Sequence, residues 1–165
     1  MSPRSRHPPA APSARLPKRA VGIPQRLLLA CGSFGPRLSA TAVASALGRG
    51  IHDADRPEPD ICILPLAETG SDARQLLDDV GFDVRMRQAR AVVIAAERLQ
   101  ERTLAGSLTF EIATRARQGG IPAYAVTGEN ALDAFDARIL DLQLILQARS
   151  RGALVAAGRK LAKLS

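Results

Sequence analysis

Short continuous apolar runs alternate along this chain with longer segments in which apolar residues recur every three or four positions. Short apolar runs bounded by turn residues are typical of strands buried on both faces, and the wider spacing is typical of helices with one apolar face. The predicted strands are residues 26–31, 60–64, 91–96, 121–126 and 142–146. The predicted helices are residues 39–49, 71–79, 103–118, 130–137 and 151–164. Strand and helix therefore alternate five times.

This alternation predicts the α/β class. Parallel strands need crossover connections, and right-handed crossovers place helices on both faces of an open sheet. We therefore expect a doubly wound, Rossmann-like three-layer domain with a mainly parallel sheet of about five strands. Ligands of such sheets bind beyond the carboxyl ends of the strands. The connections to inspect are residues 32–39, 65–72, 97–107 and 127–130.

Residues at the element boundaries support several of these limits. The Ser39 hydroxyl can accept a hydrogen bond from an otherwise unpaired amide in the first turn of the following helix. Gly119 and Gly120 are expected to end the long helix, because glycine adopts the left-handed conformation without strain. Cys31 and Cys62 fall within predicted strands, so we expect two buried thiols and no disulfide framework.

The formal net charge of +7 is concentrated at the amino-terminal end. Residues 1–26 contain six basic residues and no acidic one, whereas the remainder contains 17 basic and 16 acidic residues. Residues 1–25 are also rich in proline, so we expect a disordered basic tail there and a folded domain at residues 26–165. A nearly neutral domain without a basic stripe argues against specific nucleic-acid binding, although such a tail can bind polyanions weakly.

The remaining composition suits one packed domain. Hydrophobic residues make up 46% of the 165 residues and aromatic residues only 3%, so the core must be aliphatic. No apolar run approaches the length of a transmembrane span, and the tail lacks the apolar segment of a secretory signal. The protein is therefore expected to be cytoplasmic, with no membrane partner.

Three separate segments resemble the glycerate kinase family. Residues 27–51, LLLACGSFGPRLSATAVASALGRGI, resemble the family's opening, a strand followed by D-S-F-K-G-(S/T)-L-S-A and a helix. Residues 61–73, ICILPLAETGSDA, resemble its LPLADGGEGT segment. Residues 76–128 resemble its late segment, in which a strand leads into T-G-E-G-R-L-D-x-Q-T-x-x-G-K. The family's long central portion is missing between about Gly70 and Ala73, so the resemblance implies a Rossmann-like half without its inserted domain.

The resemblance implies phosphoryl transfer from ATP to the hydroxyl of glycerate, with magnesium. Catalysis of this kind consists mostly of positioning and of neutralising phosphate charge. In the first loop Ser33 and Ser39 match the family, whereas Gly32 and Gly35 replace its Asp and Lys. Arg37 lies two positions beyond the lost Lys and is a poor substitute, because arginine and lysine differ in reach and coordination.

The second and third loops combine matches with substitutions. Gly70 matches the family and Glu68 stands at its Asp, where a carboxylate could contact magnesium or simply favour a helix start. Arg98 and Thr103 match the third motif, and Glu97 recovers the family's Glu if the alignment shifts by one residue. Positions that are Gly, Glu, Asp or Lys in the family are occupied here by Ala95, Ala96, Gln100 and Ser107.

The sequence thus predicts a glycerate kinase-like protein with weak or no activity. The candidate phosphate- or substrate-binding residues are Ser33, Ser39, Glu68, Gly70, Glu97, Arg98 and Thr103. No catalytic residue is assigned, and the chain has no Cys/His spacing typical of a metal site. ATP and magnesium are expected only if the family's activity survives.

Two alternatives remain open. The first is a non-catalytic ligand-binding or regulatory module that takes a small organic acid or a nucleotide. The second is a homo-oligomer, or a complex with a partner chain, that covers the surface left by the missing domain.

Overall fold

The computed structural model of the chain describes residues 26–66, 72–100 and 106–164. Its strands are β1 (Leu27–Cys31), β2 (Asp60–Ile63), β3 (Ala91–Leu99), β4 (Ala123–Asn130) and β5 (Leu142–Gln147). Its helices are α1 (Ala40–Asp53), α2 (Ala73–Asp79), α3 (Phe82–Arg87), α4 (Leu108–Gln118), α5 (Ala134–Leu140) and α6 (Arg151–Ala162). The tail expected at residues 1–25 lies outside the described residues.

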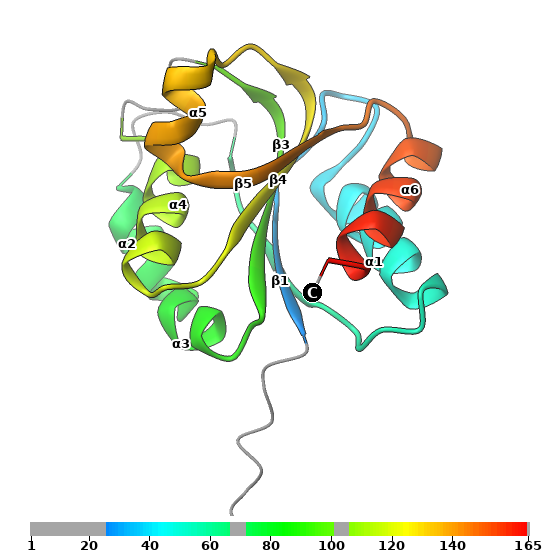
Figure 1. The fold of residues 1–165 in the computed structure, drawn as a ribbon, viewed down its shortest axis with the longest axis horizontal. Helices are drawn as coiled ribbons and strands as arrows, with labels where there is room; N and C mark the ends of the chain where they lie inside the picture. The colour runs from blue at the N-terminus through cyan, green and yellow to red at the C-terminus, as the bar shows by residue number, and fades with distance from the viewer. Residues whose placement is uncertain (1–25, 67–71, 101–105, 165) are drawn as a thin grey trace, which may run out of the picture.

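The five strands form one parallel sheet in the order β2-β1-β3-β4-β5 (Figure 1). The predicted α/β, Rossmann-like architecture is confirmed, and each strand falls where an apolar run predicted it. Strand β1 pairs with both β2 and β3. The chain therefore places β2 on one side of β1 and the later strands β3, β4 and β5 on the other side. This reversal defines a topological switch point between β1 and β3.

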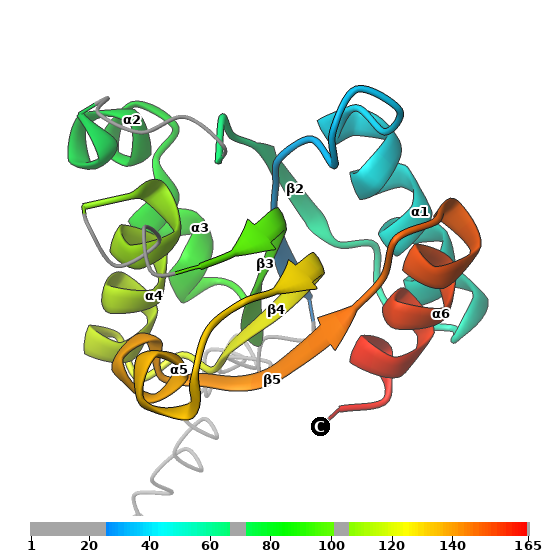
Figure 2. The ribbon, with the colours of Figure 1, turned by 90° about the horizontal axis from the view of Figure 1, so that it is seen from above.

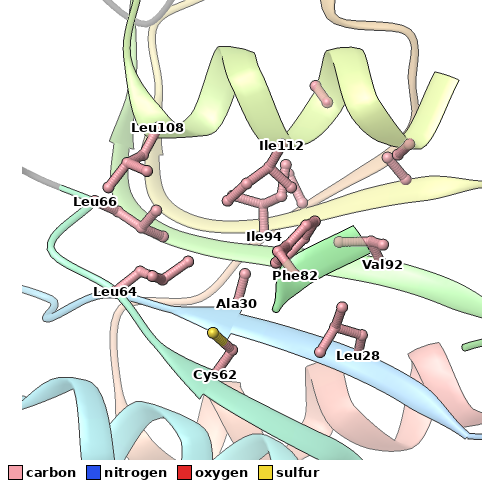
Figure 3. Close-up of a cluster of buried hydrophobic side chains, with 14 of the residues drawn as sticks. Leu28, Ala30, Cys62, Leu64, Leu66, Phe82, Val92, Ile94, Leu108 and Ile112 are labelled. Carbon is pink, nitrogen blue, oxygen red and sulfur yellow. The ribbon is translucent and has the colours of Figure 1, made fainter. Parts of the chain in front are cut away.

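Helices cover both faces of the sheet (Figures 1 and 2). Helices α1 and α6 lie on one face, and α2, α3, α4 and α5 lie on the other. Alternate residues of β1 serve the two cores, since successive side chains of a strand point to opposite faces. Leu27 and Leu29 join the cluster under α1 and α6, whereas Leu28 and Ala30 join the cluster under α3 and α4, part of which is drawn in Figure 3.

The layer of α1 and α6 depends on close backbone contact. A methyl group at Gly50 of α1 would overlap the carbonyl oxygen of Val155 in α6. A methyl group at Gly158 of α6 would overlap the carbonyl oxygen of Leu47 in α1. The absence of a side chain at both glycines therefore allows the two helices to pack at this distance.

The layer of α2 to α5 depends on side chains. Phe82 of α3 is fully buried and lies between the sheet and α4 (Figure 3). Arg115 of α4 links three helices through ion pairs, with Nη1 lying 3.0 Å from Asp78 Oδ1 and 3.1 Å from Asp83 Oδ1. Its Nε also donates to Glu111 Oε1 at 3.2 Å.

Two strands extend further than their apolar runs predicted. Strands β3 and β4 stay paired as far as Leu99 and Asn130, beyond the predicted ends at residues 96 and 126. Pairing with a neighbouring strand satisfies backbone groups whatever the polarity of the side chains, so polar residues can continue a strand. Residues 97–99 and 127–130, which were expected in the connections after β3 and β4, therefore belong to the sheet.

The helix predictions need three corrections. Helix α3 was not expected. Gly81 ends the apolar pattern of the preceding helix, and the six residues of α3 are too few to show the helical spacing of apolar positions. Helix α4 begins at Leu108 instead of Thr103, since Ser107 is its N-cap and accepts from the amide of Phe110. Helix α5 similarly begins at residue 134 instead of 130, after an N-cap at residue 133.

The two cysteines are buried and free, as predicted. Cys31 belongs to the cluster under α1 and α6, and Cys62 belongs to the cluster on the other face of the sheet. Burial raises the pKa of the Cys31 thiol to about 12 and also raises that of Cys62. Both thiols therefore act as small apolar side chains at neutral pH.

Candidate functional site

The switch point lies at the carboxyl ends of β1 and β3. The connection after β1 leads to α1 on one face of the sheet, and the connection after β3 leads to α4 on the other face (Figure 2). Ligands of doubly wound sheets bind where two such connections diverge. The predicted site residues must meet at this edge if they form one site.

The connection from β1 to α1 forms a tight loop. The amide of Phe34 donates to the carbonyl of Leu38 at 2.8 Å, and the two residues form an isolated antiparallel bridge. Gly35 within this loop has a φ of +68°, a conformation that strongly favours glycine. The tight turn of this loop therefore requires glycine at position 35.

The two candidate serines of this loop have different environments. Ser33 is exposed at the end of β1. Ser39 is the N-cap of α1, and its hydroxyl accepts from the amide of Ala42 at 3.1 Å, which confirms the predicted cap. The Ser39 hydroxyl therefore already has a structural role in starting the helix.

Gly32 and Gly35 of this loop both disfavour a side chain, for different reasons. A β-carbon at Gly32 would lie 2.9 Å from Cβ of Leu66. A β-carbon at Gly35 would lie 3.0 Å from Oε1 of Glu97, in addition to the strain of the positive φ. A side chain at either position therefore requires a shift of the surrounding structure.

Glu97 and Arg98 belong to strand β3 instead of a loop, which corrects the sequence prediction. Both side chains are exposed, and they have different neighbours. The Glu97 carboxylate lies beside Gly35, on the α1 side, whereas Arg98 Nε lies 3.5 Å from Oε2 of Glu129 on the adjacent strand. Both members of the Arg98–Glu129 pair are about half exposed. The structure therefore does not bring Glu97 and Arg98 together.

Two residues of β4 that sequence reasoning missed lie against the backbone of Glu97. The hydroxyl of Thr127 is fully buried and lies 3.2 Å from the carbonyl oxygen of Glu97. Gly128 also approaches this carbonyl, since a β-carbon at Gly128 would lie 2.9 Å from the same oxygen. The sequence signal was a lone threonine followed by glycine at a strand end, which is too common to assign a role.

The other three predicted residues, Glu68, Gly70 and Thr103, lie outside the described residues. Among the residues that the structure does describe, no group of three His, Cys, Asp or Glu side chains could hold a metal ion. No helix in that part of the chain is both long and apolar enough to cross a membrane.

A shallow cavity of about 340 Å³ lies at the opposite edge of the sheet, near the amino ends of β1, β2 and β3. Its lining includes Asp60 and Arg85, whose side chains form a two-pronged ion pair with N···O distances of 2.9 and 2.7 Å. Hydrogen bonds from Arg85 hold the pKa of Asp60 below its ordinary value, and the same pairing raises the pKa of Arg85. Arg85 also donates to the carbonyl of Ile61 at 2.7 Å, so its role in the fold is structural.

Comparisons with known proteins give no further identification. No protein-family model matches the chain, and no curated protein matches it.

Proposed function

We propose that this chain is a glycerate kinase-like protein in which phosphoryl transfer is weak or absent. The observation that carries the proposal is that Leu66 leaves no space for a side chain at Gly32 and that Gly35 has a φ of +68°, which side chains rarely adopt. These are the positions at which the resemblance places the family's acid and lysine. Leu66 crowds Gly32, and the positive φ of Gly35 disfavours any side chain there, so this loop does not supply the acid and the cation to which phosphoryl transfer is sensitive.

The start of α4 supports the same proposal. Ser107 occupies the position at which the resemblance places a second lysine. Its side chain is 7% exposed and accepts from the amide of Phe110 at 3.1 Å. A short capping residue here stabilises the helix but provides no positive charge for a phosphate.

The direct test is an assay of the purified protein with ATP, magnesium and D-glycerate, in which ADP formation is followed. We expect no ADP formation above that of a reaction without protein. ATP and magnesium act as cofactors only if activity survives. Turnover at ordinary kinase rates of about 1–100 s⁻¹ would contradict the proposal.

A double variant, Gly32→Asp with Gly35→Lys, tests whether the protein lacks only these two side chains or whether the loop around them also differs. The proposal predicts a less stable protein that remains inactive, because Leu66 and Glu97 occupy the space beside the new side chains. Activity in a stably folded double variant would mean that only the two side chains are missing.

A second candidate is a non-catalytic module that binds a small organic acid or a nucleotide at the switch point. The observation that favours it is exposed Ser33 beside the start of α1. Thermal unfolding with added ATP, ADP, glycerate or phosphate tests it, because a ligand that binds only the folded state raises the midpoint. No stabilisation by any of the four compounds would argue against this candidate.

A partner chain or a second copy is also proposed for the open edge of the sheet. Ile61 and Ile63 of edge strand β2 are 42% and 47% exposed, and they directly precede the position of the missing family portion. Light scattering coupled to size-exclusion chromatography tests self-association. A monomer at all concentrations would exclude the homo-oligomer and leave only a different partner chain.

A further inference from the structure

The Glu97 carboxylate places a negative charge directly against the loop at the switch point. Its Oε1 lies beside Gly35, within 3.0 Å of the position that a β-carbon there would take. Glu97 belongs to none of the ion pairs formed between described residues. The loop therefore faces an acidic group that belongs to the protein itself.

The backbone that carries this exposed carboxylate belongs to the sheet. The hydroxyl of Thr127 lies within hydrogen-bond distance of the Glu97 carbonyl, and β3 continues in register with β4 on both sides of Glu97. A residue fixed in a ladder on both sides has less backbone freedom than a loop residue. The sheet thus fixes the backbone from which the Glu97 side chain reaches Gly35, while the side chain itself is exposed.

We propose that Glu97 acts as a built-in anion that excludes phosphate-bearing ligands from the switch point. A phosphate approaching the Gly35 loop and the start of α1 would lie close to the carboxylate, and like charges at short range repel each other. The inference rests on the proposed function, since it concerns the same loop and gives a second physical reason for weak phosphoryl transfer. A ligand that donates hydrogen bonds, either uncharged or cationic, suits this edge better than a polyphosphate.

Calorimetric titration of inorganic phosphate and ADP into the full chain tests the proposal. The variants are Glu97→Gln, which keeps the shape of the side chain, and Glu97→Lys, which reverses its charge. We expect Glu97→Gln to bind ADP at least about tenfold more tightly than the wild type, and Glu97→Lys more tightly still at low salt. The matched control is Glu58→Gln, which removes an exposed carboxylate next to β2 and should leave binding unchanged.

Two outcomes would overturn the proposal. Equal ADP binding by the wild type and Glu97→Gln, including undetectable binding by both, would mean that the carboxylate is not what excludes phosphate. Weaker binding of magnesium–ADP by Glu97→Gln than by the wild type would identify Glu97 as a magnesium ligand instead. Far-ultraviolet circular dichroism of each variant shows whether it is folded.

The two proposals can fail separately. Absence of wild-type turnover together with unchanged ADP binding by Glu97→Gln would remove only the inference about Glu97. Wild-type turnover together with tighter ADP binding by Glu97→Gln would remove only the proposal of weak or absent phosphoryl transfer.

Discussion

The two faces of the sheet are covered in physically different ways. On one face α1 and α6 make contact through backbone at Gly50 and Gly158. On the other face four shorter helices are joined by buried side chains such as Phe82 and by the ion pairs of Arg115. The first layer is therefore sensitive to added atoms, and the second is sensitive to removed atoms.

The two layers also diverge at the switch point, where the connections after β1 and β3 lead to opposite faces of the sheet. Glu97 points toward the loop before α1, whereas Arg98 pairs with Glu129 of β4. Two polar side chains that are adjacent in sequence thus have different partners. Convergence of site residues in such a fold depends on which face each strand position serves.

The largest expected effect is the loss of Phe82. Phe82→Ala should destabilise the protein by about 3–5 kcal/mol, because it leaves a cavity under α3 and α4. Urea unfolding followed by circular dichroism measures the change. The control is Phe135→Ala on α5, a residue 70% exposed, which should alter stability by less than about 0.5 kcal/mol. Equal effects of the two substitutions would contradict the assigned core.

An added methyl group tests the opposite layer. Gly158→Ala should cost about 2–3 kcal/mol, because the new β-carbon meets the carbonyl of Leu47 and forces α1 and α6 apart. Gly152→Ala, on the same helix with open space around it, should be neutral or stabilise by up to about 1 kcal/mol. The comparison between the faces fails if Gly158→Ala is as well tolerated as Gly152→Ala.

The ion pairs between α2, α3 and α4 should contribute less. The Arg115 side chain is 12% exposed, but its partners Asp78 and Asp83 are 61% and 47% exposed. Arg115→Met keeps the aliphatic stem and should cost about 1–2 kcal/mol, between the values for exposed and buried pairs. Arg98→Met breaks a half-exposed pair and should cost under about 0.5 kcal/mol in the same unfolding assay. A larger loss from Arg98→Met would reverse this ranking.

Acid should remove the stabilisation that the Asp60–Arg85 pair provides. Pairing with Arg85 lowers the pKa of Asp60 below 3.8, so the ionised carboxylate stabilises the folded state above that pH. This stabilisation should be lost as the pH falls below 3.8 through the folded-state pKa. Urea unfolding of wild type and Asp60→Asn should therefore differ at neutral pH and converge in strong acid. A difference that persists there would assign the effect to packing instead of charge.

Much of the fold follows from local pattern. The apolar runs identify the strands. The unbroken runs of β1 and of the first part of β3 reflect burial on both faces, whereas the edge strands β2 and β5 are only partly buried. The cap at Ser39 is equally local, since the hydroxyl and the amide of Ala42 are three residues apart. Helix α3 and the polar ends of β3 and β4 could not be obtained in this way, because long-range pairing and burial decide them.

The candidate site was less predictable than the fold. Ser33 and Ser39 do lie in one loop, but Ser39 is engaged as a helix cap. The sequence placed Glu97 and Arg98 in a shared connection, whereas pairing of β3 with β4 makes both of them strand residues with different neighbours. The contact between Glu97 and Gly35 joins two segments far apart in the chain, and no local pattern announces it.

The sequence by itself determined which segments are strands and helices and which side chains are apolar enough to be buried. These properties depend on neighbours within a few residues, where hydrophobic periodicity and capping act. Only the tertiary structure decided that β1 lies between β2 and β3, that α1 and α6 meet at glycines, and that Glu97 faces Gly35. Those features depend on packing between distant segments, because a side chain acquires its partners only when the sheet is assembled.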